Sequence, residues 1–115
     1  MGDKAIALAS DLNCCVPFTP LQFVKTAQAA DAAVALKSSR EYFRQAILIG
    51  KKALAGTDNV TDINLGFSSA VSEQPIVISP GGTYVLEPPP GGKWNFNDLY
   101  LKVGTNGDGV VVIYC

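Results

Sequence analysis

The second half of the chain is a series of short apolar segments, each closed by turn residues. Five segments have the length and composition of strands: Val60–Phe67, Gln74–Ser79, Thr83–Glu87, Asp98–Val103 and Gly109–Cys115. The residues between them are mainly glycine, proline, serine and asparagine, which favour turns. Segments this short, rich in β-branched residues and regularly interrupted, predict an all-β fold, either an antiparallel β-sandwich or a jelly-roll-like barrel.

The length of 115 residues predicts one domain, and a hydrophobic fraction of 48% is enough to form its core. We expect residues 1–20 to form an extended N-terminal arm and residues 21–115 to form the β domain. Apolar side chains near this boundary favour burial away from water, so we expect them to contact a partner: Val16, Phe18, Leu21, Phe23 and Val24. The competing interpretation makes this segment a strand of the domain's own sheet.

Composition also argues against several functional classes. The formal net charge is −1 and the basic residues are scattered, whereas phosphate contacts need clustered Lys or Arg, so we expect no nucleic-acid binding. No targeting segment and no apolar stretch of about 18 residues is present, so we expect no membrane span. The sequence has no histidine and no paired nucleophile and base. We therefore expect no enzyme activity, no metal or cofactor site and no small-molecule substrate.

The three cysteines are Cys14, Cys15 and Cys115. Adjacent cysteines rarely bond to each other, because the geometry is strained. We expect free thiols in a reducing compartment, while a bond from Cys14 or Cys15 to Cys115 stays open.

Two segments allow more than one structure. Residues 26–36 are alanine-rich, which favours a helix, although Ala33–Lys37 also fits a short strand. The last strand is apolar on both faces. It is therefore either central in a sheet with other residues packed on both faces, or it presents one face to a partner. The second option favours an oligomer. The loop Gly104–Gly109 precedes a strand and not a helix, so it predicts a hairpin turn and not a phosphate cradle.

Three aromatic residues, Trp94, Phe96 and Tyr100, follow the loop Pro88–Gly92. They could form an exposed platform for stacking sugar rings. They could equally close one end of the β domain, which is the more common role of large aromatic side chains.

Residues 33–115 resemble a type of small β-structured module found among tailed-phage virion proteins. Five stretches carry the resemblance: AVALKSS (33–39), REYFRQAILIGKKAL (40–54), VTDINLGFSSA (60–70), QPIVISPGGTYVLEPPPG (74–91) and FNDLYLKVGTNGDGVVVIY (96–114). In such modules the segment before the first arginine is extended, so the resemblance implies a strand at Ala33–Lys37. It carries over no catalytic residue.

The resemblance implies a structural virion protein, a capsid decoration (cement) protein that binds the major capsid protein through its arm and its β domain. A homo-oligomer is expected, with a trimer as the first choice, because three-fold positions are natural docking sites on an icosahedral shell. Its expected location is the outer surface of the capsid, after synthesis in the host cytoplasm. The alternative is a carbohydrate- or receptor-binding module of a phage fibre or spike, with Trp94, Phe96 and Tyr100 exposed together.

Overall fold

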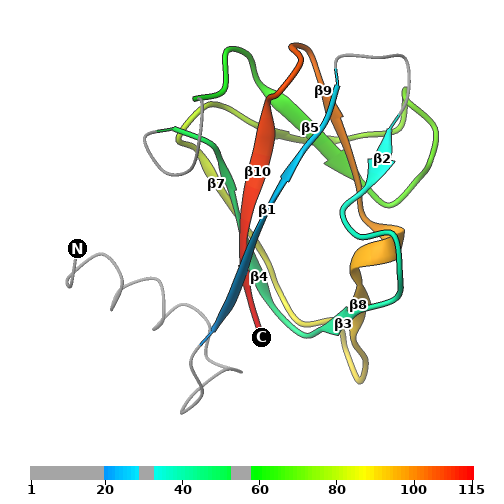
Figure 1. Ribbon diagram of the computed structural model, residues 1–115. Helices are drawn as coiled ribbons and strands as arrows, with labels where there is room; N and C mark the ends of the chain where they lie inside the picture. Colours follow the sequence, from blue (N-terminus) through cyan, green and yellow to red (C-terminus); the bar gives the residue numbers. More distant parts are fainter. Residues whose placement is uncertain (1–19, 29–32, 53–57) are drawn as a thin grey trace.

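The computed structural model describes residues 20–28, 33–52 and 58–115, and every strand pairing in it is antiparallel (Figure 1). These ranges contain no α-helix, only the 3-10 turn η2 (Phe96–Asp98). The strands are β1 (Leu21–Thr26), β2 (Val34–Ala35), β3 (Tyr42–Phe43), β4 (Ala46–Gly50), β5 (Ile63–Gly66), β6 (Ile76–Ile78), β7 (Thr83–Leu86), β8 (Trp94–Asn95), β9 (Tyr100–Val103) and β10 (Gly109–Tyr114). The all-β prediction is confirmed.

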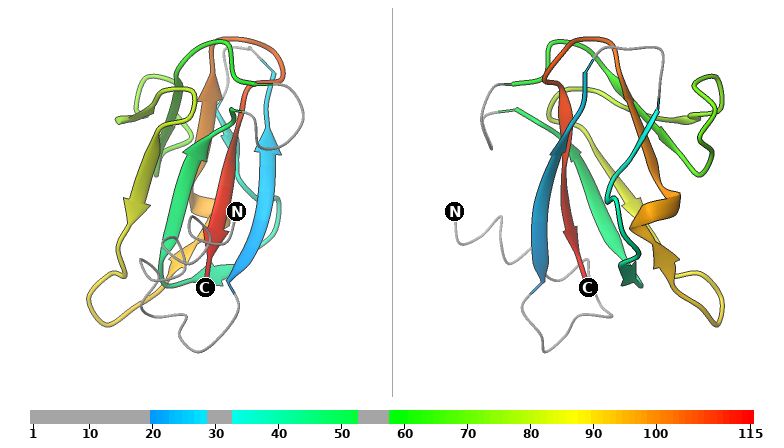
Figure 2. Two further views of the ribbon diagram at one scale, coloured as in Figure 1. Left: turned by 90° about the vertical axis from the view of Figure 1, so that its left-hand side faces the viewer. Right: turned by 45° about the vertical axis from the view of Figure 1, so that its right-hand side comes forward.

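The strands form two four-stranded sheets, in the orders β1-β10-β4-β7 and β2-β9-β5-β6, and a short ribbon of β3 and β8. Figure 2 shows the first sheet face-on, and the second sheet lies behind it. The pairings are nested along the chain: β5 pairs with β6, β4 with β7, β3 with β8, β2 with β9, and β1 with β10. The chain therefore folds as one long hairpin, with its tip between β5 and β6. Contacts of β10 with β4 and of β9 with β5 then complete the two sheets.

The two sheets share one hydrophobic core, formed by alternate residues of their strands. In β6, Ile78 is buried while its neighbour Val77 is 59% exposed, and in β9 the alternate residues Leu101 and Val103 are buried. The buried residues of this core are Leu36, Phe43, Ala46, Leu48, Ile63, Leu65, Ile78, Leu86, Phe96, Leu99, Leu101, Val103, Val110, Val112 and Tyr114.

An aromatic cluster closes the core beside the β3–β8 ribbon. Phe96 is fully buried and its ring stacks on Phe43, with centroids 3.9 Å apart. Phe23 and Tyr114 meet the same ring edge-on at 5.0 and 4.7 Å. Phe96 therefore fills the core, and its prediction as part of an exposed platform is wrong. Phe23 is likewise turned inward from β1, so it does not form an outward contact for a partner.

The last strand takes the first of its two predicted arrangements. β10 is central in its sheet, and Val112 faces the shared core while Val111 is buried on the opposite face. Val111 forms a second apolar cluster with Ile47 and Ile49 of β4. Burial on both faces explains why polar residues do not alternate along this strand.

The loop Gly104–Gly109 does not form the predicted hairpin turn, because β9 and β10 belong to different sheets. It crosses from one sheet to the other, and side chains hold it in place. The side chain of Asn59 bonds both backbone groups of Gly109 at 2.8 Å. The buried carboxylate of Asp108 accepts hydrogen bonds from the backbone N–H groups of Val60 and Thr61, at 3.0 and 3.1 Å.

The alanine-rich segment divides between two strands. Thr26 ends β1, and Val34–Ala35 form β2, so the strand expected at 33–37 is present; residues 29–32 lie outside the described residues. Residues 44–45 separate β3 from β4. In the part of the chain that the structure describes, no helix is long and apolar enough to cross a membrane.

Cys115 is disulfide-bonded, so the expectation of a free thiol is wrong at this residue. Its partner lies outside the described residues. Hydrogen bonds from Arg44 N–H to the Cys115 carbonyl (2.8 Å) and from Cys115 N–H to the Gln45 carbonyl (3.1 Å) fix its backbone. The side chain packs against the second apolar cluster.

Candidate ligand-binding cleft

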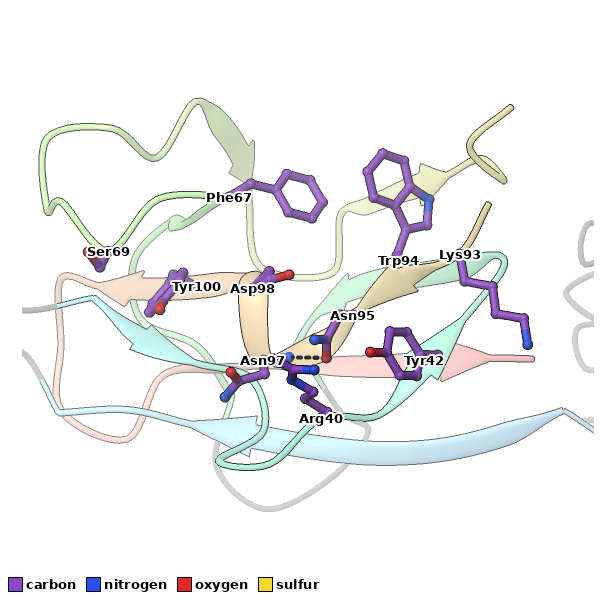
Figure 3. A pocket seen from close by; sticks show the side chains of 10 residues that line it. All are labelled: Arg40, Tyr42, Phe67, Ser69, Lys93, Trp94, Asn95, Asn97, Asp98 and Tyr100. Atoms are coloured by element: carbon purple, nitrogen blue, oxygen red, sulfur yellow. Dashed lines mark hydrogen bonds between the residues drawn. The ribbon is translucent and has the colours of Figure 1, made fainter. Parts of the chain in front are cut away.

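An open cleft of about 760 Å³ lies over the β3–β8 ribbon and η2, and Figure 3 shows its side chains. Four aromatic rings and six polar or charged side chains line it. They are Arg40, Tyr42, Phe67, Ser69, Lys93, Trp94, Asn95, Asn97, Asp98 and Tyr100.

Strand β3 of the ribbon sends one side chain to the core and the next to the cleft. Phe43 and Trp94 are paired, as are Tyr42 and Asn95. Because successive side chains of a strand point to opposite faces, the burial of Phe43 turns Tyr42 outward, where it is 54% exposed. The core aromatic residue thus sets the direction of its cleft neighbour.

Asn95 shapes the floor of the cleft. Its side-chain oxygen accepts hydrogen bonds from the backbone N–H groups of Glu41 (3.2 Å) and Asn97 (3.0 Å). The second bond caps η2, in which Phe96 is buried and Asn97 lines the cleft. The Asn97 amide then donates to the carbonyl of Lys37 at 3.0 Å. Backbone groups therefore hold two of the cleft's polar side chains.

Two aromatic rings form the apolar wall. Phe67 and Trp94 stack with centroids 5.0 Å apart and ring planes 25° apart. The indole N–H of Trp94 donates to the Glu87 carbonyl at 2.7 Å, which fixes the ring. Phe67 is 44% exposed, although its two-residue spacing from the buried Ile63 and Leu65 would place it on the core face of a longer strand. It lies just after the end of β5, where the strand alternation no longer applies.

The loop after Phe67 is closed by its own side chains. The Gln74 amide donates to the carbonyls of Ser68 (2.7 Å) and Ala70 (2.9 Å). The Ser68 hydroxyl donates to Glu73 at 2.9 Å. Phe67 and Ser69, on either side of Ser68, both line the cleft, with the Phe67 ring beside Trp94.

A charged cluster anchors the segment that carries Arg40 and Tyr42. The Lys37 ammonium lies 2.8 Å from a Glu41 carboxylate oxygen and 4.4 Å from the centre of the Phe23 ring. The Tyr114 hydroxyl donates to the other carboxylate oxygen. The hydrogen bond from Lys37, followed by that from Tyr114, holds the pKa of Glu41 below its ordinary value of 4.5. Burial, followed by the bond to Glu41, raises the pKa of Tyr114 to about 12.

We expect this cluster to limit stability at both ends of the pH range. The Glu41 contribution is present above its unfolded pKa near 4.5 and is lost as pH falls through the lower folded value. The Tyr114 contribution is present below pH 10 and is lost as pH rises through about 12. An ultraviolet titration of tyrosinate should show a late step near pH 12 that is missing from Tyr114→Phe. A late step retained in that variant would contradict the assignment.

The structure brings only some of the predicted residues to this cleft. Trp94 and Tyr100 line it, whereas Phe96 does not. Tyr42 and Phe67 were missed, because the sequence pattern assigns them to strands far from Trp94 and does not show that the three meet.

The predicted partner contacts lie elsewhere. Leu21 and Val24 are 58% and 40% exposed on β1, at the edge of the first sheet. Phe23 is in the core, and Val16 and Phe18 lie outside the described residues. Among the described residues, no three His, Cys, Asp or Glu side chains lie together in a way that could hold a metal ion.

Comparisons with protein-family models, with curated proteins and with solved structures find no match to this chain. Flat, fixed aromatic rings beside amide, hydroxyl and charged groups suit a ligand that has both an apolar face and many hydroxyl groups.

Proposed function

We propose that this chain is a non-enzymatic structural protein of a tailed-phage particle and that its cleft binds carbohydrate, as a receptor-binding module of a fibre or spike would. The phage setting rests on the resemblance of residues 33–115. The proposal that the ligand is a carbohydrate rests on one observation, the stacked pair of Trp94 and Phe67 with polar side chains beside it.

A sugar ring matches the two kinds of surface in the cleft. The C–H groups of a pyranose face carry slight positive charge and pack against the electron-rich faces of aromatic rings. Its hydroxyl groups then reach the amide of Asn97, the hydroxyl of Ser69 and the carboxylate of Asp98. Because hydrogen bonds fix Trp94 before a ligand arrives, binding has less conformational entropy to overcome.

We also propose a finer fold class, a β-sandwich of jelly-roll type with residues 1–20 as an extended arm. The nested strand pairing and the two four-stranded sheets around one core support the jelly roll. Jelly rolls occur in both viral capsid and lectin domains, so the fold suits either function without deciding between them.

The fluorescence of Trp94 tests carbohydrate binding directly, because it is the chain's single tryptophan. Titration of the intact protein with a panel of oligosaccharides should change the Trp94 emission saturably for at least one of them. Isothermal calorimetry on the same ligand should give the same affinity. A panel that leaves both the emission and the heat signal unchanged would contradict the proposal.

The second candidate is the capsid decoration (cement) protein, and the observation that favours it is the edge strand β1. Its one strand partner among the described residues is β10, and Leu21 and Val24 are exposed along it. An extended segment of the major capsid protein could add to this edge by main-chain hydrogen bonds. In this function the chain is a trimer on the outer capsid surface.

Light scattering of the purified chain, alone and with empty phage shells, separates the two candidates. A trimer that binds shells with saturation, and loses binding when Leu21 and Val24 become serine, supports the decoration function. A monomer that ignores shells but responds to a saccharide supports the carbohydrate function.

A further inference from the structure

We infer that the cleft selects an acidic saccharide, whose carboxylate binds the guanidinium of Arg40. This inference rests on the proposed carbohydrate binding and adds the chemical class of the ligand.

The first reason is the charge of the cleft. Arg40 and Lys93 line it with two positive charges, and Asp98 contributes one negative charge, so the lining carries a net charge of +1. The whole chain has a net charge of −1. The cleft lining is thus positively charged although the whole chain is negatively charged, and the electrostatic field of the lining attracts anions.

The second reason is that these cations have no carboxylate partner within the described residues. The ion pair between Lys37 and Glu41 includes neither of these cations. Glu41 lies next to Arg40 in the chain, but its two carboxylate oxygens are taken by Lys37 and Tyr114. The acidic residue closest in sequence is therefore committed elsewhere, and Arg40 is left exposed in the cleft.

The third reason is the placement of the charges. In Figure 3, Tyr42 lies between Arg40 and Lys93, while Asp98 lies toward Phe67. In this view Asp98 lies nearer to Phe67 than Arg40 does. A sugar stacked on the aromatic wall could place an acidic group toward the cations while Asp98 accepts hydrogen bonds from its hydroxyl groups.

Arginine suits this ligand better than lysine. Its planar guanidinium presents two parallel N–H groups to a carboxylate, which fixes the orientation of the acid as well as attracting its charge. Lys93 supplies charge without that geometry. We therefore assign orientation to Arg40 and general attraction to Lys93.

The experiment compares an oligosaccharide of hexuronic acids with its carboxyl-reduced derivative, which keeps the sugar ring and has an uncharged CH2OH group in place of each carboxylate. We expect the acidic form to bind the intact protein about tenfold more tightly, the usual effect of one hydrogen-bonded charged group. Arg40→Gln should remove this preference, and Arg40→Lys should restore part of it. Arg44→Gln is the matched control, because Arg44 is an exposed arginine outside the cleft lining.

The outcomes separate this inference from the proposed function. Equal affinity for the two forms, unchanged in Arg40→Gln, would overturn the acidic preference and leave carbohydrate binding intact. An acidic preference that persists in Arg40→Gln would also overturn the assignment to Arg40. Absence of binding by every saccharide in the panel, with no change of Trp94 emission, would overturn the proposed function itself.

Discussion

Replacement of Phe96 by alanine is expected to lower the free energy of unfolding by about 3–5 kcal/mol, the usual cost of removing a buried phenylalanine ring. Phe96 is fully buried, stacks on Phe43 and meets Phe23 and Tyr114 edge-on. The alanine variant leaves a cavity where η2, β1, β3 and β10 meet. Since the free energy of unfolding of such domains is about 5–15 kcal/mol, the substitution removes a large share of it.

Urea denaturation followed by circular dichroism measures this loss. Phe67→Ala is the matched control, because Phe67 is 44% exposed and lies outside the shared core, so we expect a much smaller change. Equal losses in the two variants would contradict the assignment of Phe96 to the core and Phe67 to the cleft.

Replacement of Trp94 by alanine should weaken saccharide binding about 30-fold or more, as expected for an aromatic residue that dominates a binding site. The substitution removes the larger ring of the apolar wall and leaves Phe67 without its stacking partner. Calorimetry is the appropriate measurement, because the variant has no tryptophan to observe.

A second variant distinguishes loss of the contact between Trp94 and the sugar from displacement of the segment that holds Trp94 through Glu87. Trp94→Phe keeps an aromatic face but loses the indole bond to the Glu87 carbonyl. We expect it to retain most of the binding if stacking on the sugar is the main interaction. If Trp94→Phe binds as poorly as Trp94→Ala while both variants unfold at the same urea concentration as the wild type, the stacking explanation is wrong.

Local patterns were sufficient for most of the strands. Ile76 and Ile78 alternate with Val77, and Leu101 alternates with Lys102, so the buried face of each segment is visible in the sequence. This works because the alternation of side chains depends only on extended backbone. The pattern fails at Phe67, one residue past the end of its strand.

The pairing between strands could not be predicted from local sequence patterns in the same way. The loop Gly104–Gly109 has the composition of a hairpin turn, yet it connects two sheets, because β10 pairs with β1 and β4. The composition of a turn indicates that the chain changes direction there. It does not indicate which strands then pair with each other. The partner of each strand depends on burial across the whole core.

The same limit applies to the cleft. Trp94 and Tyr100 were predicted candidates, but their neighbours Tyr42 and Phe67 come from segments far away in the chain. Phe96, between the two candidates in sequence, faces the core from the short 3-10 turn η2, whose N-terminus is capped by Asn95. A strand pattern read from the sequence does not predict this interruption between β8 and β9.

Short-range information in the amino-acid order was therefore enough for the all-β class, for most strands and for their buried faces, since backbone geometry alone sets those features. The nested pairing, the assembly of the cleft and the disulfide state of Cys115 depend on contacts between segments distant in the chain. Such contacts form only when the two sheets close over their shared core, which is why no single stretch of residues could reveal them.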